Sequence, residues 1–193
     1  DQLSKLRGAA MKLGQMISMD AGDVLPPELT AILARLRNSA HYMPTAQLNK
    51  VLIAEWGADW RRKFLHFETT PIAAASIGQV HRATLRDGTV LAIKVQYPGI
   101  ADSIEADVDN VASLLRISNL LPTKLDISPL LAEAKKQLRE EADYVREATQ
   151  MQLYKKLLAE DPNFLVPSAF TPLSTQRVLA MDFIPGQSIE ILE

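Results

Sequence analysis

Two strand-like segments joined by a tight turn constrain the fold of this chain more than any other feature of its sequence. The segments, residues 77–85 and 89–96, are rich in β-branched and aliphatic residues, and the Asp87-Gly88 pair between them favours the turn of a β-hairpin. Because side chains alternate between the faces of a strand, Lys94 lies on the face opposite the larger aliphatic residues. Those aliphatic residues are Leu91, Ile93 and Val95. The sequence therefore predicts an antiparallel sheet with one core face and one lysine on the other face.

Helical periodicity flanks this hairpin on both sides. Apolar residues recur every three or four positions, which is the spacing of an amphipathic helix. The predicted helices cover residues 3–17, 27–37, 45–56, 104–120 and 128–160, and two further strands are predicted at 164–167 and 177–184. We therefore predict an α+β fold, with a helical extension at residues 1–66 followed by a sheet and a long helix at residues 67–193.

The composition excludes several classes of function. Lys and Arg number 21 against 23 Asp and Glu, and the net charge of −2 argues against nucleic acid as a partner. The absence of cysteine excludes disulfides and thiolate metal sites and suits a reducing compartment. The histidines, His41, His66 and His81, lack metal-ligand spacing, so we predict no metal site and expect structural or surface roles for them. No apolar run approaches the roughly 20 residues that span a bilayer, which leaves peripheral membrane contact open.

Two tryptophans near a basic segment allow two interpretations. Trp56 and Trp60 with residues 61–64 are compatible with a basic aromatic binding patch, or with a helix end that docks its tryptophans on the core. We favour docking on the core.

Five motifs follow one another along the chain. They are KLGQ at 12–15, AAASIGQVHRA at 73–83, LAIKVQYPGI at 91–100, EADYVREA at 141–148 and VLAMDFIPG at 178–186. Each is weak evidence alone, but together and in this order they resemble the ABC1/UbiB family of atypical kinases. The resemblance implies a protein-kinase-like N-terminal lobe, made of an antiparallel sheet plus a long C-type helix, with a KxGQ helical extension before it.

The resemblance also implies a nucleotide site in which an alanine-rich loop replaces the glycine-rich loop of kinases. Glycine lets backbone N–H groups close around phosphates, whereas each alanine adds a methyl group, so we expect a stiffer loop that holds phosphate more loosely. By resemblance, Lys94 is the lysine on the phosphate side, Glu147 is its partner on the helix, and ATP or ADP is the cofactor. The implied loop residues are Ala73, Ala74, Ala75, Ser76, Ile77 and Gly78.

The segment MDFIPG is similar to the hinge that holds adenine in kinases. The resemblance places Met181 at the back of the pocket and makes the Asp182 carbonyl and the Ile184 N–H the contacts. The catalytic and magnesium-binding residues of kinases lie in a second lobe, and no His-Arg-Asp or Asp-Phe-Gly segment occurs here. We therefore interpret the chain as a segment of a longer protein that contains no catalytic residue, needs the second lobe for Mg²⁺, and does not turn over nucleotide alone.

The KLGQ motif is expected to latch the extension onto the nucleotide site. The resemblance implies that this segment folds over the cleft, with Lys12 and Gln15 near the acids Glu141 and Asp143. Glu141 interrupts an apolar stripe on the predicted helix, so its carboxylate needs a partner. The stripe consists of Ala134, Leu138, Val145 and Ala148. The alternative is an exposed lysine and a solvated acidic helix.

Lys94 is expected to pair with Glu147 and not with Glu141. On one regular helix the two glutamates lie about 120° apart, so both cannot readily reach one lysine.

Two functions are compatible with the motifs. The first is an atypical kinase or ATPase that supports ubiquinone biosynthesis at a membrane. The second is a pseudokinase that binds nucleotide as a switch and scaffolds a membrane-associated, lipid-modifying complex. The implied partners are nucleotide, the second lobe and proteins of quinone biosynthesis, in the cytoplasm or at the periphery of a bacterial or organellar inner membrane. Release of ADP by the full-length protein would separate the two.

Overall fold

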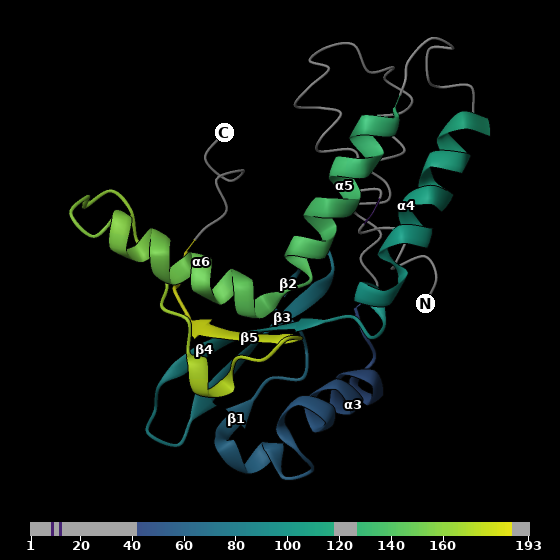
Figure 1. The fold of residues 1–193 in the computed structure, drawn as a ribbon. Coiled ribbons are helices and arrows are strands. Elements are labelled where there is room, and N and C mark those ends of the chain that lie inside the picture. The colour runs from purple at the N-terminus through teal and green to yellow at the C-terminus, as the bar shows by residue number, and fades with distance from the viewer. Residues whose placement is uncertain (1–8, 10–11, 13–41, 118–126, 187–193) are drawn as a thin grey trace.

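One antiparallel sheet organises the part of the chain that the computed structural model describes, which is residues 42–117 and 127–186 together with Ala9 and Lys12 (Figure 1). Five strands from these residues pair in the order β1-β3-β4-β5, and β2 also pairs with β3. The strands are β1 (Phe64–Phe67), β2 (Ala73–Ala74), β3 (Gly78–Leu85), β4 (Val90–Gln96) and β5 (Val178–Asp182). The helices predicted at 3–17 and 27–37 lie outside the described residues. The predicted α+β fold is confirmed.

The predicted hairpin joins β3 to β4. Gly88 has a φ of 89°, a backbone conformation that favours glycine, and the Asp87 carboxylate accepts a hydrogen bond of 2.9 Å from the Thr89 N–H. The predicted alternation along β4 is also present, because Lys94 is half-buried while the side chains on the other face are buried. Those buried side chains are Leu91, Ile93 and Val95.

Helices lie on both sides of the sheet. α3 (Thr45–Trp56) has the predicted bounds and is followed by Gly57, whose φ of 86° lets the chain leave the helix. α4 (Ile100–Ile117) starts earlier than predicted, directly after the Pro98-Gly99 turn. In Figure 1, α3 lies below the sheet, and the helices that follow β4 lie above it.

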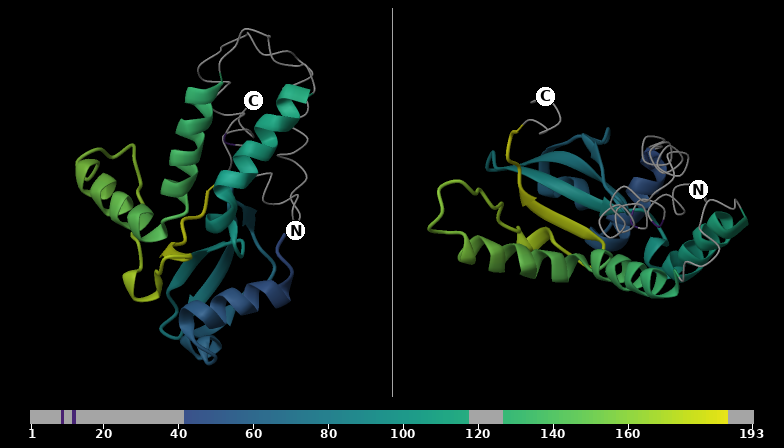
Figure 2. Two further views of the ribbon diagram at one scale, coloured as in Figure 1. Left: turned by 45° about the vertical axis from the view of Figure 1, so that its right-hand side comes forward. Right: turned by 90° about the horizontal axis from the view of Figure 1, so that it is seen from above.

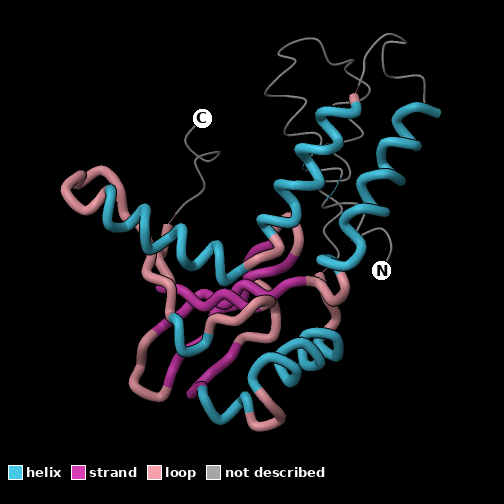
Figure 3. The backbone as a smooth tube through the Cα atoms, in the orientation of Figure 1, coloured by secondary structure: helices cyan, strands magenta, loops and turns pink. Residues whose placement is uncertain are grey.

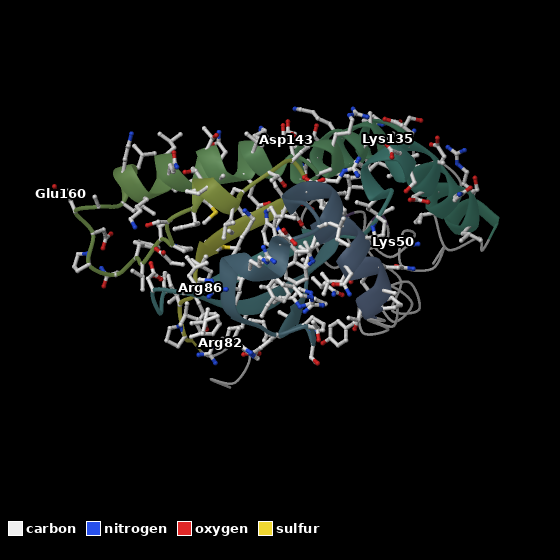
Figure 4. The ribbon with its side chains drawn as sticks, turned by 90° about the horizontal axis from the view of Figure 1, so that it is seen from below. Lys50, Arg82, Arg86, Lys135, Asp143 and Glu160 are labelled. Atoms are coloured by element: carbon white, nitrogen blue, oxygen red, sulfur yellow. The ribbon has the colours of Figure 1, made fainter. Side chains whose placement is uncertain are left out.

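The single helix predicted over residues 128–160 is wrong, because the segment forms two helices. α5 (Ser128–Glu141) and α6 (Tyr144–Leu157) are separated by a bend at which Asp143 is the N-cap of α6. The Asp143 carboxylate accepts a hydrogen bond of 3.0 Å from the Arg146 N–H, and this local contact competes with continuation of the helix. Figure 3 shows the bend, and Figure 4 labels Asp143 there.

The bend also corrects the predicted apolar stripe. Ala134 and Leu138 on α5 are buried, and so is Ala148 on α6. Val145 is 51% exposed, because it lies on a second helix that runs in another direction. The periodicity of one straight helix therefore holds only up to the bend.

α4 and α5 pack side by side as a helical hairpin that projects from the sheet (Figures 1 and 2). Lys135 on α5 lies 3.2 Å from Glu105 and 2.8 Å from Asp109, both on α4, and Arg139 also pairs with Glu105. The carboxylates are largely exposed, so each pair contributes only about 0–1 kcal/mol. No helix in the described part of the chain is long and apolar enough to cross a membrane.

The last two predicted strands differ in outcome. β5 lies within the predicted 177–184, whereas residues 164–167 form no strand, so that prediction is wrong. Phe164 and Leu165 are 57% and 74% exposed, and without a surface to pack on, apolar side chains do not hold a strand in a sheet. Instead, Ala169 makes an isolated β-bridge with Met181.

The tryptophans dock on the core, as favoured from the sequence. Trp60 is 1% exposed, and its ring centroid lies 4.9 Å from that of Phe67 and 6.2 Å from that of Phe64. The Trp56 indole N–H donates a hydrogen bond of 2.9 Å to the Leu173 carbonyl. These contacts bring β1 into the core, although β1 crosses the predicted boundary at residue 66. That division of the chain into 1–66 and 67–193 stays a prediction.

A buried polar network surrounds His81. Gln79 Oε1 accepts a hydrogen bond of 2.7 Å from the Met43 N–H, and Gln79 Nε2 lies 2.9 Å from His81 Nε2. His81 Nδ1 lies 2.9 Å from the Glu68 carbonyl oxygen. Because that carbonyl can only accept, Nδ1 carries the proton, and because the Gln79 oxygen is already used, its amide nitrogen donates to Nε2. His81 is therefore a neutral, structural histidine.

The stability of the protein is expected to fall as pH drops below about 6.5, in part because of His81. Burial lowers the pKa of the His81 imidazole, and the hydrogen bond to Glu68 offsets part of that effect. The unfolded chain then binds a proton that the folded chain resists, so the stabilisation is complete above the ordinary histidine pKa and is lost below it. Urea unfolding between about pH 5 and 7.5 measures this, with His66→Gln, at an exposed position, as the control. If His81→Gln leaves the pH dependence as steep as His66→Gln does, His81 is not its source.

Candidate functional site

Lys94 and Glu147 form the ion pair that was predicted from the sequence. The Lys94 ammonium on β4 lies 2.7 Å and 2.8 Å from the two carboxylate oxygens of Glu147 on α6. The side chains are 18% and 32% exposed, so the pair is partly shielded from water but can be reached. The bend before α6 places Glu147 in the first turn of a new helix, and the angle expected on one straight helix therefore does not explain the pairing. The pair itself is confirmed, while its role towards nucleotide stays a proposal.

Tyr144 lies beneath Lys94, which the sequence analysis missed. The Lys94 ammonium is 4.8 Å from the centroid of the Tyr144 ring, within range of a cation–π interaction. The Tyr144 hydroxyl is buried and has no hydrogen-bond partner among the described residues. Burial raises the pKa of the Tyr144 phenol well above its ordinary value, and the negative charges of Glu147 and Glu141 raise it further. The available signal was its spacing, because a residue three positions before Glu147 lies on the same helix face.

The alanine-rich loop is a folded turn attached to the sheet. Ala73 pairs with Val80 across β2 and β3, and the Ala75 N–H donates a hydrogen bond of 2.9 Å to the Gly78 carbonyl. Ile77 is 1% exposed as a whole residue and belongs to the core, so it is not open to a ligand. In the region that the structure describes, the N–H groups of Ser76 and Ile77 donate no hydrogen bond. Ser76 is partly exposed whereas Ile77 is buried, so of these two groups only the Ser76 N–H is a candidate contact for an anion.

Close packing requires a glycine at position 78. A Cβ atom at this position would lie 2.3 Å from the Val95 carbonyl oxygen and 3.1 Å from the Tyr144 hydroxyl. The glycine therefore lets β4 and the tyrosine approach the loop closely. This is a structural reason for the one glycine that remains in the loop.

Glu141 joins Lys12 to the loop. Its Oε1 lies 2.5 Å from the Lys12 ammonium, which is the contact expected for the latch, and its Oε2 accepts a hydrogen bond of 2.9 Å from the Ser76 hydroxyl. Asp143, also named for the latch, serves instead as the N-cap of α6, and Gln15 lies outside the described residues. The Ser76 contact was not predicted from the sequence.

The predicted hinge continues from β5. Met181 is partly buried and pairs with Ala92 on β4. The Asp182 side chain accepts a hydrogen bond of 2.8 Å from the Ser168 N–H, so this carboxylate supports the fold. Ile184 is 37% exposed, just beyond the strand. The adenine contacts assigned to the Asp182 and Ile184 backbone stay predictions.

Lys94 on the sheet pairs with Glu147 on α6, and the alanine-rich loop lies against the strands beside them. This arrangement defines a protein-kinase-like N-terminal lobe. The model of the ABC1 atypical kinase-like domain matches residues 35–193, and the chain belongs to this family.

Known relatives agree with this assignment. The chain is 44% identical over 189 residues to the protein named "Atypical kinase COQ8, mitochondrial" of Saccharomyces cerevisiae, an alignment that covers 98% of this chain and 38% of the relative. It is 47% identical over 184 residues to "Atypical kinase COQ8B, mitochondrial" of Rattus norvegicus, covering 95% of this chain and 35% of the relative. The solved complex of Rv3197 with erythromycin from Mycobacterium tuberculosis matches with a TM-score of 0.58 and 31% identity, over 90% of this chain and 44% of that one. The chain thus spans little more than a third of these curated relatives.

Proposed function

We propose that this chain is the nucleotide-binding lobe of an ABC1-family atypical kinase or ATPase, and that it binds ATP or ADP beside the alanine-rich loop. The observation that carries the proposal is the Lys94–Glu147 pair, formed by both carboxylate oxygens at 2.7 Å and 2.8 Å. An ammonium group has three donors, so two bonds to Glu147 leave one for a phosphate oxygen. The glutamate fixes the position of Lys94, which is the arrangement that kinases use for phosphates.

The loop and the hinge complete the proposed site. The Ser76 N–H, which donates no hydrogen bond within the described part of the chain, suits the phosphates, and the exposed Ala73 and Ala74 place methyl groups in the same loop. On the other side of the site, the Asp182 carbonyl and the Ile184 N–H hold the adenine, with Met181 behind it. The loop is therefore proposed to bind phosphate more weakly than a glycine-rich loop would.

Magnesium binding is proposed to belong to the second lobe of the full-length protein. No group of three or more potential metal ligands from His, Asp and Glu lies together among the described residues. Phosphoryl transfer depends on bound metal and on positioning, so the lobe alone is proposed to bind nucleotide without hydrolysing it. The full-length protein is proposed to support quinone lipid biosynthesis, as the family resemblance implies, at the periphery of an inner membrane. Relatives are named as mitochondrial kinases.

A nucleotide-gated scaffold is the second candidate, and the contact between Lys12 and Glu141 favours it. This contact, at 2.5 Å, attaches Lys12 to the lobe next to the loop. A residue held there is suited to respond to nucleotide as a switch. Measurement of ADP release by the full-length protein separates the candidates, because a scaffold releases none above background.

Lys94→Ala is expected to weaken ATP and ADP binding by at least about tenfold, the effect of losing one charge-assisted hydrogen bond. Titration with a fluorescent nucleotide analogue measures the affinity, and circular dichroism confirms that the variant is folded. Lys50→Ala, on the exposed side of α3, is the matched control, because Lys50 projects away from the α5–α6 bend marked by Asp143 (Figure 4).

Two results would contradict the proposed site. The first is an equal affinity of the wild type and the folded Lys94→Ala variant. The second is hydrolysis of ATP by the isolated chain that Lys94→Ala abolishes, because that would place catalytic groups within these residues.

A further inference from the structure

We propose that Ser76 is a positioning residue that couples the alanine-rich loop to Lys12 through the Glu141 carboxylate. The inference rests on the proposed function only in naming this loop as the phosphate side of the site. It goes beyond the latch itself, because it states how the latch and the loop affect each other.

The two contacts use different oxygens of one carboxylate. Lys12 is 2.5 Å from Oε1, and the Ser76 hydroxyl donates to Oε2 at 2.9 Å. The three residues come from separate parts of the chain, which are the N-terminal segment, the loop between β2 and β3, and the last position of α5. Glu141 is therefore the point at which these parts meet.

The geometry makes the two contacts support each other. The Glu141 side chain is 32% exposed, and a glutamate side chain that is free on one side loses considerable rotamer freedom when one partner holds it. When Lys12 has already fixed the carboxylate, Ser76 can bond to it without that entropic cost, and the reverse also holds. Each contact is thus expected to be stronger when the other is present.

The loop passes this coupling to the site. Ser76 lies between Ala75, whose N–H bonds the Gly78 carbonyl, and Ile77, whose carbonyl accepts a hydrogen bond of 3.0 Å from the Tyr97 N–H. A change in the position of Ser76 therefore acts on the two backbone bonds that flank it in the loop. A ligand that draws the loop away from α5 would release Lys12, and release of Lys12 would loosen the loop.

The coupling can be tested without nucleotide. Chemical acylation followed by mass spectrometry measures how reactive the Lys12 amine is, and Ser76→Ala is expected to raise its rate about three- to tenfold, corresponding to the loss of one hydrogen bond. Ser76→Thr keeps a hydroxyl group and should stay near the wild-type rate. Lys50 is an internal control in every sample, and Ser113→Ala, which removes an exposed serine on α4, is the matched control variant.

The reciprocal experiment follows the loop. Lys12→Met should raise amide hydrogen exchange at Ala75 and Tyr97 about three- to tenfold, while Lys50→Met leaves it unchanged. The Gly57 amide, bonded at 2.9 Å to the Ile53 carbonyl, reports any general loosening.

Three results would overturn the coupling. They are unchanged Lys12 reactivity in Ser76→Ala, unchanged loop exchange in Lys12→Met, and an equal change at Lys50 or Gly57, which would show only a general loss of stability. Since neither experiment contains nucleotide, these results do not bear on the proposed nucleotide binding. Conversely, an affinity for nucleotide that does not depend on Lys94 would refute that function and not the coupling.

Discussion

Trp60→Ala is expected to lower the free energy of unfolding by about 3–5 kcal/mol, the usual cost of removing a large buried aromatic side chain. The Trp60 side chain is 1% exposed and contacts the rings of Trp56, Phe64 and Phe67. These rings join the end of α3 and the first strand to the core of the lobe. Removal of the Trp60 side chain leaves a cavity that a sheet with short edge strands cannot easily close.

Urea unfolding followed by far-UV circular dichroism measures this loss, since the substitution itself changes tryptophan fluorescence. Leu65→Ala is the matched control, because Leu65 lies on β1 but is 68% exposed, and it should cost little. A loss below about 1 kcal/mol for Trp60→Ala would mean that this aromatic cluster does not stabilise the lobe. The expected result would instead show that residues before the predicted boundary at 66 are needed to fold the sheet.

The hairpin and the Lys94 pair could be predicted because their signals are local or shared by a family. Asp87-Gly88 specifies a tight turn through backbone conformation alone, and alternation along β4 then places Lys94 opposite the core face. The partner, Glu147, lies 53 residues away in the sequence, and only the family resemblance connected the two.

The sequence contains a local signal for the bend between α5 and α6, namely Asp143, but this residue was interpreted differently. Asp143 was interpreted as part of an acidic latch, yet aspartate is also among the strongest N-cap residues, and here it caps α6. Periodicity cannot detect such a break, because the apolar spacing continues on both sides of it. As a consequence, the angle between Glu141 and Glu147 that was expected for one straight helix is wrong.

The contact between Ser76 and Glu141 could not be predicted from the sequence. The two residues are 65 positions apart, and a single serine in an alanine-rich loop has no pattern that identifies its partner. The contact exists because the helix ends at Glu141, directly beside the loop, and that ending was itself missed. A local error about a helix end therefore hid a contact between distant parts of the chain.

Gly78 illustrates how the same residue can satisfy two explanations that make different predictions. As a remnant of a glycine-rich loop, it would serve phosphate binding, and a substitution would reduce affinity for nucleotide while leaving stability unchanged. In the structure, a Cβ atom at this position would lie 2.3 Å from the Val95 carbonyl oxygen and 3.0 Å from the carbonyl carbon. Both are backbone atoms of the central strand β4, which cannot move aside as the end of a flexible side chain would. We therefore expect the packing explanation to dominate.

Gly78→Ala is accordingly expected to lower the free energy of unfolding by about 1–3 kcal/mol or more, because the strand or the loop must shift to admit the methyl group. Gly186→Ala is the matched control, since no atom lies within 4 Å of the Cβ position there. Measuring Gly78→Ala again in a Tyr144→Phe background separates the two close contacts. The tyrosine hydroxyl is 3.1 Å from the Cβ position, so its removal should relieve only a minor part of the loss if the Val95 carbonyl is the main obstacle. Wild-type stability of Gly78→Ala, combined with weaker nucleotide binding, would show that the glycine serves the phosphates and that the strand accommodates a side chain.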